Sequence, residues 1–145
     1  MKDPIAVIPE GASLKAVAEH VYETAASKGW HDGPPRDIGT VVALLHSEVS
    51  ELYEEHRAGR KPAEVYYVSI KGGPVPDRVA YPSGQGGFDF AAAGVKPEGI
   101  PPELADVVIR AFDVAVEFGI DLDYYIRLKD AYNRTRSRKH GGKVE

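Results

Sequence analysis

The sequence of 145 residues contains no cysteine, and this absence excludes several kinds of chemistry. Without a thiol the chain forms no disulfide, offers no thiolate to a metal ion and has no cysteine nucleophile. Disulfides are typical of oxidising compartments, so their absence agrees with a reducing environment. A cytoplasmic location is expected.

Long apolar runs and a secretion signal are also missing. No apolar stretch approaches the about 20 residues that a membrane-spanning helix needs. The first residues, MKDPIAVIPEG, lack the apolar core of a signal peptide. No membrane partner is therefore expected.

The overall composition is that of an ordinary folded chain. Hydrophobic residues make up 43% and charged residues 28% of the sequence, which is typical of a globular domain. The length predicts one domain over residues 1–145. The net charge of −4 is unevenly distributed, because seven Lys or Arg lie between Arg127 and Lys143 beside a single acidic residue, Asp130. A basic end on an acidic body indicates an anionic ligand or a solvated tail.

Apolar residues at helical spacing, together with capping residues, predict four helices. The first starts at Ser13 and stops at Gly29, and the second runs from Asp37 to near Gly59. The third opens with Pro101 and Pro102 and stops at Gly119; the fourth starts at Asp121 or Asp123 and runs through Tyr132. The expected fold is therefore all-α, a four-helix bundle.

Three segments do not fit a helix. Residues 1–12 are predicted to be an N-terminal arm, and residues 134–145 a basic C-terminal tail. Residues 60–100 form an insertion between the second and third helices. There, EVYYVSI has the composition of a strand, the Gly72–Pro74 segment of a turn, and RVAY of a return strand, so a β-hairpin is expected. The segment GVKPEGIPP is assigned to a loop.

Two of the helices carry paired carboxylates beside their apolar faces. Glu48 and Glu51 are three residues apart on the second helix, and Glu103 and Asp106 repeat that spacing on the third. Side chains at i and i+3 are neighbours on a helix, so two packed helices would gather four carboxylates. A bound cation is one resolution of their repulsion, and all-oxygen ligation selects Mg²⁺ or Mn²⁺. Asp113 is a candidate for a further ligand or for a partner of the ligands.

The competing interpretation is an ordinary solvated surface. Glutamates at i and i+3 are common on exposed helix faces, and one such pair alone is in most cases structural. The recurrence of the pair on a second amphipathic helix favours a metal site.

The segments LLHSEVSELYEEHR, PPELADVVIRAFDVAVEFGIDL and KDAYNRTRSRKHGGK together resemble the MazG-like family of all-α nucleotide pyrophosphohydrolases. The resemblance implies that Glu48, Glu51, Glu103 and Asp106 bind Mg²⁺, and that Glu48 or Glu51 orients or deprotonates the attacking water. It also implies that Lys129, Asn133 and Arg136 hold the triphosphate.

The function that this resemblance implies is the Mg²⁺-dependent hydrolysis of a nucleoside triphosphate to the monophosphate and pyrophosphate, as in nucleotide pool sanitation. A homodimer or homotetramer with shared sites is also implied. Trp30, the only tryptophan, either stacks on the nucleobase or packs over a helix end.

Two alternatives stay open. A helical interaction module would bind nucleic acid through the basic C-terminal tail, although that tail lacks the interleaved aromatic residues of a single-strand platform, so nucleic acid is not the expected partner. A pyrophosphohydrolase of the same fold would act instead on a phosphoribosyl-nucleotide.

Overall fold

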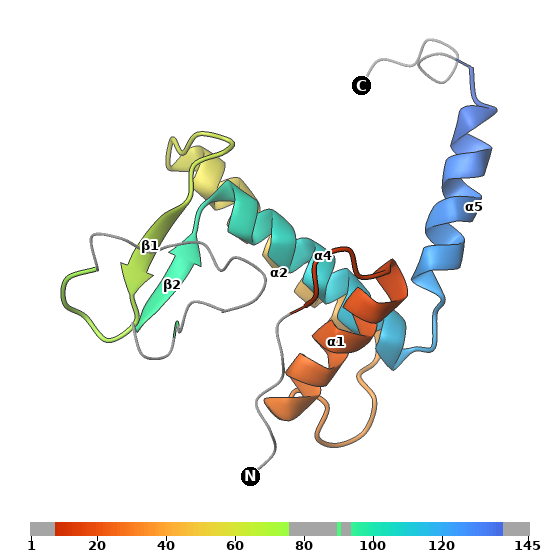
Figure 1. Cartoon of the computed structure of the whole chain (residues 1–145), viewed down its shortest axis with the longest axis horizontal. Coiled ribbons are helices and arrows are strands. Elements are labelled where there is room, and N and C mark those ends of the chain that lie inside the picture. Colours follow the sequence, from red (N-terminus) through yellow and green to blue (C-terminus); the bar gives the residue numbers. More distant parts are fainter. Residues whose placement is uncertain (1–7, 76–89, 91–93, 138–145) are drawn as a thin grey trace.

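A computed structural model of the chain describes residues 8–75, 90 and 94–137. This part is mostly helical, with four helices and one small sheet, as Figure 1 shows. The helices are α1 (Leu14–Ser27), α2 (Ile38–Arg57), α4 (Ile100–Glu117) and α5 (Leu122–Arg134), and the strands are β1 (Tyr66–Ser69) and β2 (Val95–Glu98). Within the described ranges, no helix combines the length and the apolar character needed to cross a membrane.

The helices begin and end where local chemistry predicts. Side-chain oxygens of Ser13, Asp37 and Asp121 accept hydrogen bonds from backbone N–H groups in the first turns of α1, α2 and α5, at 3.0 to 3.2 Å. Each cap satisfies a backbone donor that the helix itself leaves unpaired. Two prolines lie in the first turn of α4, where a missing N–H is tolerated.

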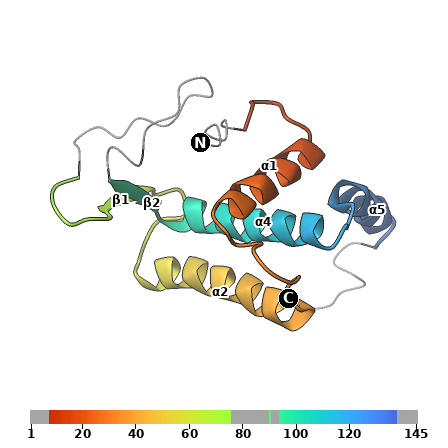
Figure 2. The ribbon, with the colours of Figure 1, turned by 90° about the horizontal axis from the view of Figure 1, so that it is seen from below.

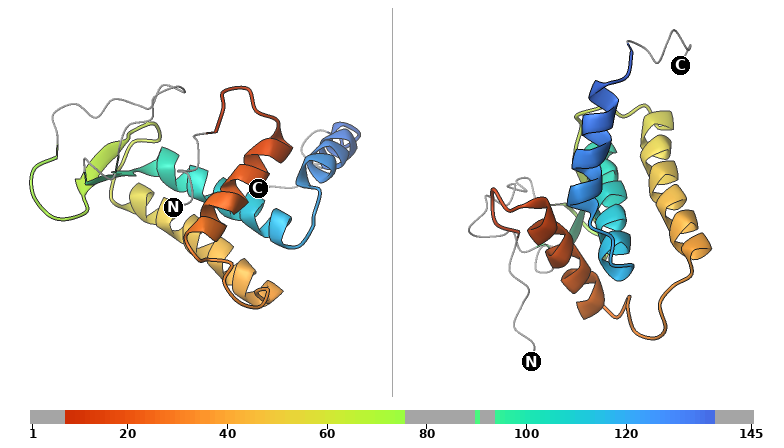
Figure 3. Two further views of the ribbon diagram at one scale, coloured as in Figure 1. Left: turned by 60° about the horizontal axis from the view of Figure 1, so that its bottom comes forward. Right: turned by 90° about the vertical axis from the view of Figure 1, so that its right-hand side faces the viewer.

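Helix α4 is the centre of the fold, because α1 packs along one side of it and α2 along another (Figures 2 and 3). Ala18 and Val21 of α1 and Phe112 of α4 form one buried cluster. Val41 of α2 and Val95 of β2 are fully buried, at 0% and 1% exposure. These contacts fix the α2 and α4 faces that carry the paired carboxylates.

Helix α5 differs from the expected fourth member of a bundle. It leaves the C-terminal end of α4 and extends away from the other three helices (Figures 1 and 2). None of its residues is buried. Its apolar stripe is exposed, and consists of Tyr124, Tyr125, Leu128 and Tyr132.

The small sheet corrects one sequence-based prediction. Strand β1 pairs antiparallel with β2, in the register Tyr66 to Glu98 and Ser69 to Val95. The partner strand therefore comes from the GVKPEG segment, and its assignment to a loop was wrong; RVAY lies outside the described residues. A proline within β2 is tolerated because each strand of a two-stranded sheet is an edge strand.

Candidate functional site

Three of the predicted metal ligands converge between α2 and α4. Glu48, Glu51 and Glu103 each contribute one carboxylate oxygen, and these three oxygens lie within 4.8 Å of one another. Glu48 lies on the side of α2 that carries the buried Val41, two turns earlier, and is itself buried. Glu51 is exposed. The acidic cluster of Glu48, Glu51 and Glu103 therefore opens to solvent on the Glu51 side.

Glu103 is the most buried member of this cluster, with 3% of its surface exposed. Burial, followed by a hydrogen bond with the Glu98 side chain, raises the pKa of Glu103 to about 7. Its Oε2 atom is buried and has no hydrogen-bond partner among the residues that the structure describes. An unpaired buried oxygen is costly unless something binds it, so the cluster fits a cation ligated by oxygen.

Asp106, the fourth predicted ligand, lies beside the cluster without belonging to the set of mutually close oxygens. Its pKa is raised by burial and then by the negative charge of Glu48, while Lys96 and Arg110 oppose this shift. The two helices thus gather the four predicted acids, three at one point and one next to it.

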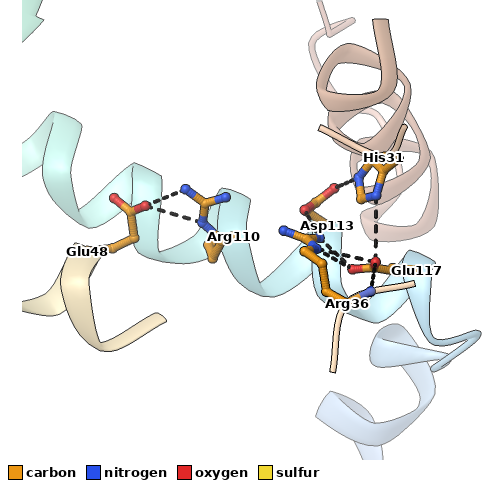
Figure 4. Close-up of polar contacts among 6 residues, drawn as sticks. All are labelled: His31, Arg36, Glu48, Arg110, Asp113 and Glu117. Atoms are coloured by element: carbon orange, nitrogen blue, oxygen red, sulfur yellow. Dashed lines mark hydrogen bonds and ion pairs between the residues drawn. The ribbon is translucent and has the colours of Figure 1, made fainter. Parts of the chain in front are cut away.

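Arg110 is a cation at this site that the sequence analysis did not identify. Its Nη2 and Nε atoms donate to Glu48 Oε1 at 2.6 and 3.2 Å, as Figure 4 shows. Arg110 follows Asp106 by four residues and Glu103 by seven, which is the spacing of one helix face. That spacing was a usable signal, and the resulting ion pair offsets part of the charge of the buried glutamate.

Lys96 is a second cation beside the acids, and it comes from strand β2. Its Nζ atom lies 2.9 Å from Glu98 Oε1. Its positive charge opposes the rise in the pKa of both Glu103 and Asp106. No sequence pattern indicated this position, because it depends on the strand pairing that the loop assignment missed.

Asp113 is engaged in a separate buried network at the other end of α4 (Figure 4). His31 Nε2 lies 2.6 Å from Asp113 Oδ1, and Arg36 Nη2 donates to Asp113 Oδ2 at 2.8 Å. The Arg36 Nε atom also donates to Glu117 Oε2 at 2.9 Å, and this hydrogen bond is the main reason why the pKa of Glu117 is lowered. Both Asp113 oxygens are occupied, so the residue ties the linker between α1 and α2 to α4.

A cavity of about 290 Å³ lies next to the acids, and Trp30, Lys28, Glu48, Asp106 and Arg110 are among the residues that line it. Trp30 follows the end of α1 and is 63% exposed, so most of its surface is open to solvent. An aromatic ring, the cations Lys28 and Arg110, and the acids Glu48 and Asp106 therefore line one concave region.

The predicted triphosphate-binding residues lie elsewhere in the single chain. Lys129, Asn133 and Arg136 are exposed, on α5 or directly after it. Helix α5 starts beyond the C-terminal end of α4, and Glu103 lies in the first turn of α4, about 20 Å away along the axis at 1.5 Å per residue. One chain by itself does not bring these residues to the acidic cluster.

Comparison with protein-family models, with curated proteins and with solved structures gives no match. The resemblance to the MazG-like family therefore stays a prediction, carried by the two acid motifs and the basic motif of the sequence.

Proposed function

We propose that this protein is a Mg²⁺-dependent nucleoside triphosphate pyrophosphohydrolase with a MazG-like helical fold. The observation that carries the proposal is the convergence of Glu48, Glu51 and Glu103, one of which, Glu103, has a buried oxygen without a hydrogen-bond partner among the described residues. Carboxylates held this close repel one another, and a hard divalent cation removes that repulsion.

Glu48, Glu51 and Glu103 would hold the ion, with Asp106 beside them. When bound, Mg²⁺ would neutralise phosphate charge and lower the pKa of a coordinated water. Mn²⁺ prefers the same oxygen ligands. The cavity next to the acids supplies room for the nucleotide, and the exposed ring of Trp30 supplies a surface on which a base can stack.

The environments of Glu48 and Glu51 favour different roles. Glu48 is buried and paired with Arg110, with 2.6 Å between Nη2 and Oε1, so its charge is already engaged. Glu51 is exposed and has solvent access. Glu51 is therefore the better candidate to orient or deprotonate the attacking water, while Arg110 is placed to stabilise negative charge on a phosphate oxygen.

Release of pyrophosphate from a panel of canonical and modified nucleoside triphosphates, with Mg²⁺ and with EDTA, tests the proposal. We expect metal-dependent release and a monophosphate product, with at least a 100-fold loss in Glu51→Gln. Glu54→Gln is the matched control, since Glu54 lies on the same helix, is exposed and pairs only with Arg57 among the described side chains. If no triphosphate of the panel releases pyrophosphate, or if Glu51→Gln keeps full activity, the proposal is overturned.

We further propose that the functional unit is at least a homodimer. Helix α2 carries a second, exposed apolar stripe next to its α4-facing side, made of Ile38, Val42, Val49 and Tyr53. These four residues fall within about 60° of one another on a helical wheel. The stripe is centred about 110° from Glu48 on the same wheel, so a second copy seated on it would cover an exposed apolar face of the helix that carries Glu48 and Glu51.

Helix α5 is the natural occupant of this stripe. It is a helix of 13 residues without a buried side chain, and isolated helices of that length are marginal in water. Its apolar face borders Lys129, Asn133 and Arg136, so α5 of the second copy would bring these residues alongside the helix that carries Glu48 and Glu51. Sedimentation should show a dimer. Val49→Asp should dissociate it, whereas Leu104→Asp, at an exposed apolar position of α4, should leave it intact. The reverse pattern would contradict this arrangement.

A further inference from the structure

Strand β2 brings a lysine and a glutamate to the edge of the acidic cluster. Lys96 and Glu98 are two residues apart in an extended strand, so their side chains leave the same face. Lys96 Nζ lies 2.9 Å from Glu98 Oε1, and the Glu98 side chain shares a hydrogen bond with Glu103. A continuous series of contacts therefore leads from Lys96 to the centre of the cluster.

Lys96 is held in place by contacts between the two-stranded sheet and the rest of the chain. Val95 is buried at 1% exposure. In the paired strand, the Tyr66 hydroxyl donates to Glu55 Oε1 at 3.0 Å, which ties β1 to the last turns of α2. Gly99 joins β2 to α4 so closely to the chain at Glu64 that a Cβ atom there would lie 2.4 Å from the Glu64 carbonyl oxygen. Lys96 is therefore held relative to both helices that carry the acids.

The two cations beside the acids differ in their availability. The Arg110 side chain is 23% exposed and forms an ion pair with the buried Glu48. The Lys96 side chain is 51% exposed, so an anion arriving from solvent can reach it. The ion pair is open to solvent on the Lys96 side, whereas the Glu98 side chain is 18% exposed and also shares a hydrogen bond with Glu103. Lys96 can therefore turn toward a phosphate while Glu98 keeps a partner.

We propose that Lys96 is a substrate-binding residue, which exchanges its ion pair with Glu98 for a contact with the polyphosphate of the substrate. The proposal rests on the pyrophosphohydrolase function proposed above. It gives the insertion between α2 and α4 a role, since β2 supplies a cation on the Glu103 side of the cluster while Arg110 lies on the Glu48 side. The compact ammonium on a flexible stem suits such an exchange.

The test separates cation binding from phosphate binding. Mn²⁺ binding is followed by electron paramagnetic resonance, and binding of inorganic tripolyphosphate with Mg²⁺ by calorimetry, for the wild type, Lys96→Met, Lys96→Arg and Lys15→Met. Lys15 is the matched control, a lysine with a glutamate neighbour at 3.8 Å, on α1.

We expect Lys96→Met to bind tripolyphosphate about tenfold more weakly, the loss of one charge-assisted contact, and to raise KM with little change in kcat. Its Mn²⁺ binding should be as tight as in the wild type or tighter, because a positive charge has left the vicinity of the acids. Lys96→Arg should recover most of the tripolyphosphate affinity, and Lys15→Met should match the wild type.

Tripolyphosphate affinity unchanged in Lys96→Met would overturn the proposal and leave Lys96 as a partner of Glu98 alone. Loss of Mn²⁺ binding in Lys96→Met would overturn it too, because the role would then be structural. A wild type that binds no Mn²⁺ would refute the proposed function itself, and that result is read before any variant is compared.

Discussion

Glu103 is a buried acid whose protonation links folding to the proposed metal site. Its folded-state pKa of about 7 lies above the ordinary value of 4.5, so the folded state binds an extra proton between these two values. Stability from this group is therefore fully present below pH 4.5 and is lost as the pH rises through about 7. At higher pH the buried carboxylate is charged and destabilises the fold unless a cation binds it.

Glu103→Gln should consequently stabilise the metal-free protein at pH 8 by about 3 kcal/mol, the free-energy equivalent of a pKa raised from 4.5 to about 7. The gain should vanish near pH 4.5, where the wild-type carboxyl is protonated. Thermal unfolding at both pH values measures the difference, with Glu54→Gln as the control on an exposed position. Added Mg²⁺ should raise the Tm of the wild type and leave that of Glu103→Gln unchanged; a variant less stable than the wild type at pH 8 would refute this account.

The affinity for the metal should depend on pH for the same reason. Below pH 7 the Glu103 carboxyl must release a proton before its oxygens bind a cation, so the Kd for Mn²⁺ should rise about tenfold per pH unit there. Above pH 8 the Kd should level off. Titration at pH 6, 7 and 8 checks this, and the pH dependence should weaken in Glu103→Gln. A Kd independent of pH in the wild type would show that Glu103 is not a ligand.

Among the helices and strands, the sequence predicted those features whose signals come from residues close together in the chain, namely the helix caps and the acid pairs. The caps at Ser13, Asp37 and Asp121 act within three residues of the helix starts, and the acid pairs need only helical spacing. Each can be recognised in a short window of sequence.

The features that the sequence analysis missed depend on residues far apart in the chain. Ser69 pairs with Val95 across the insertion, and the proline within β2, together with a glycine at each of its ends, obscured the strand pattern. His31 and Arg36 meet Asp113 across about 80 positions, so nothing near Asp113 in the sequence indicates that its oxygens are occupied. Lys96 was missed for the same reason, while Arg110 had a local signal in its spacing from Asp106.

The network of Arg36, Asp113 and Glu117 should be a large contributor to stability, because all three side chains are mostly buried. Arg36→Met leaves two buried carboxylates without their cation and should lower the free energy of unfolding by about 3–5 kcal/mol. Arg57→Met, which breaks an exposed pair with Glu54, should cost less than about 1 kcal/mol.

Urea unfolding measures both variants. Adding Glu117→Gln to Arg36→Met removes one of the stranded charges, so the double variant should recover part of the loss. Equal stabilities of Arg36→Met and Arg57→Met would mean that the linker between α1 and α2 is not held by this network.

For the whole molecule, the single chain separates groups that the proposed reaction needs together. The acids lie between α2 and α4, whereas Lys129 and Arg136 are exposed at the far side of the molecule, along α5 and after its end. Two apolar stripes, on α2 and on α5, are uncovered. Pairing the α2 stripe of one chain with α5 of another would cover both stripes, and in a symmetric dimer each contact occurs twice.

Shared sites make a specific prediction for mixed dimers. One inactive chain would carry Glu51→Gln, and the other Lys129→Ala together with Arg136→Ala. In a heterodimer with swapped α5 helices, one site loses both its acid and its cations, while the other combines intact acids with intact cations. Heterodimers purified through two different tags should therefore regain about half of the wild-type rate per dimer, while either homodimer stays inactive. If α5 serves the acids of its own chain, both sites of the heterodimer stay damaged, and no activity returns.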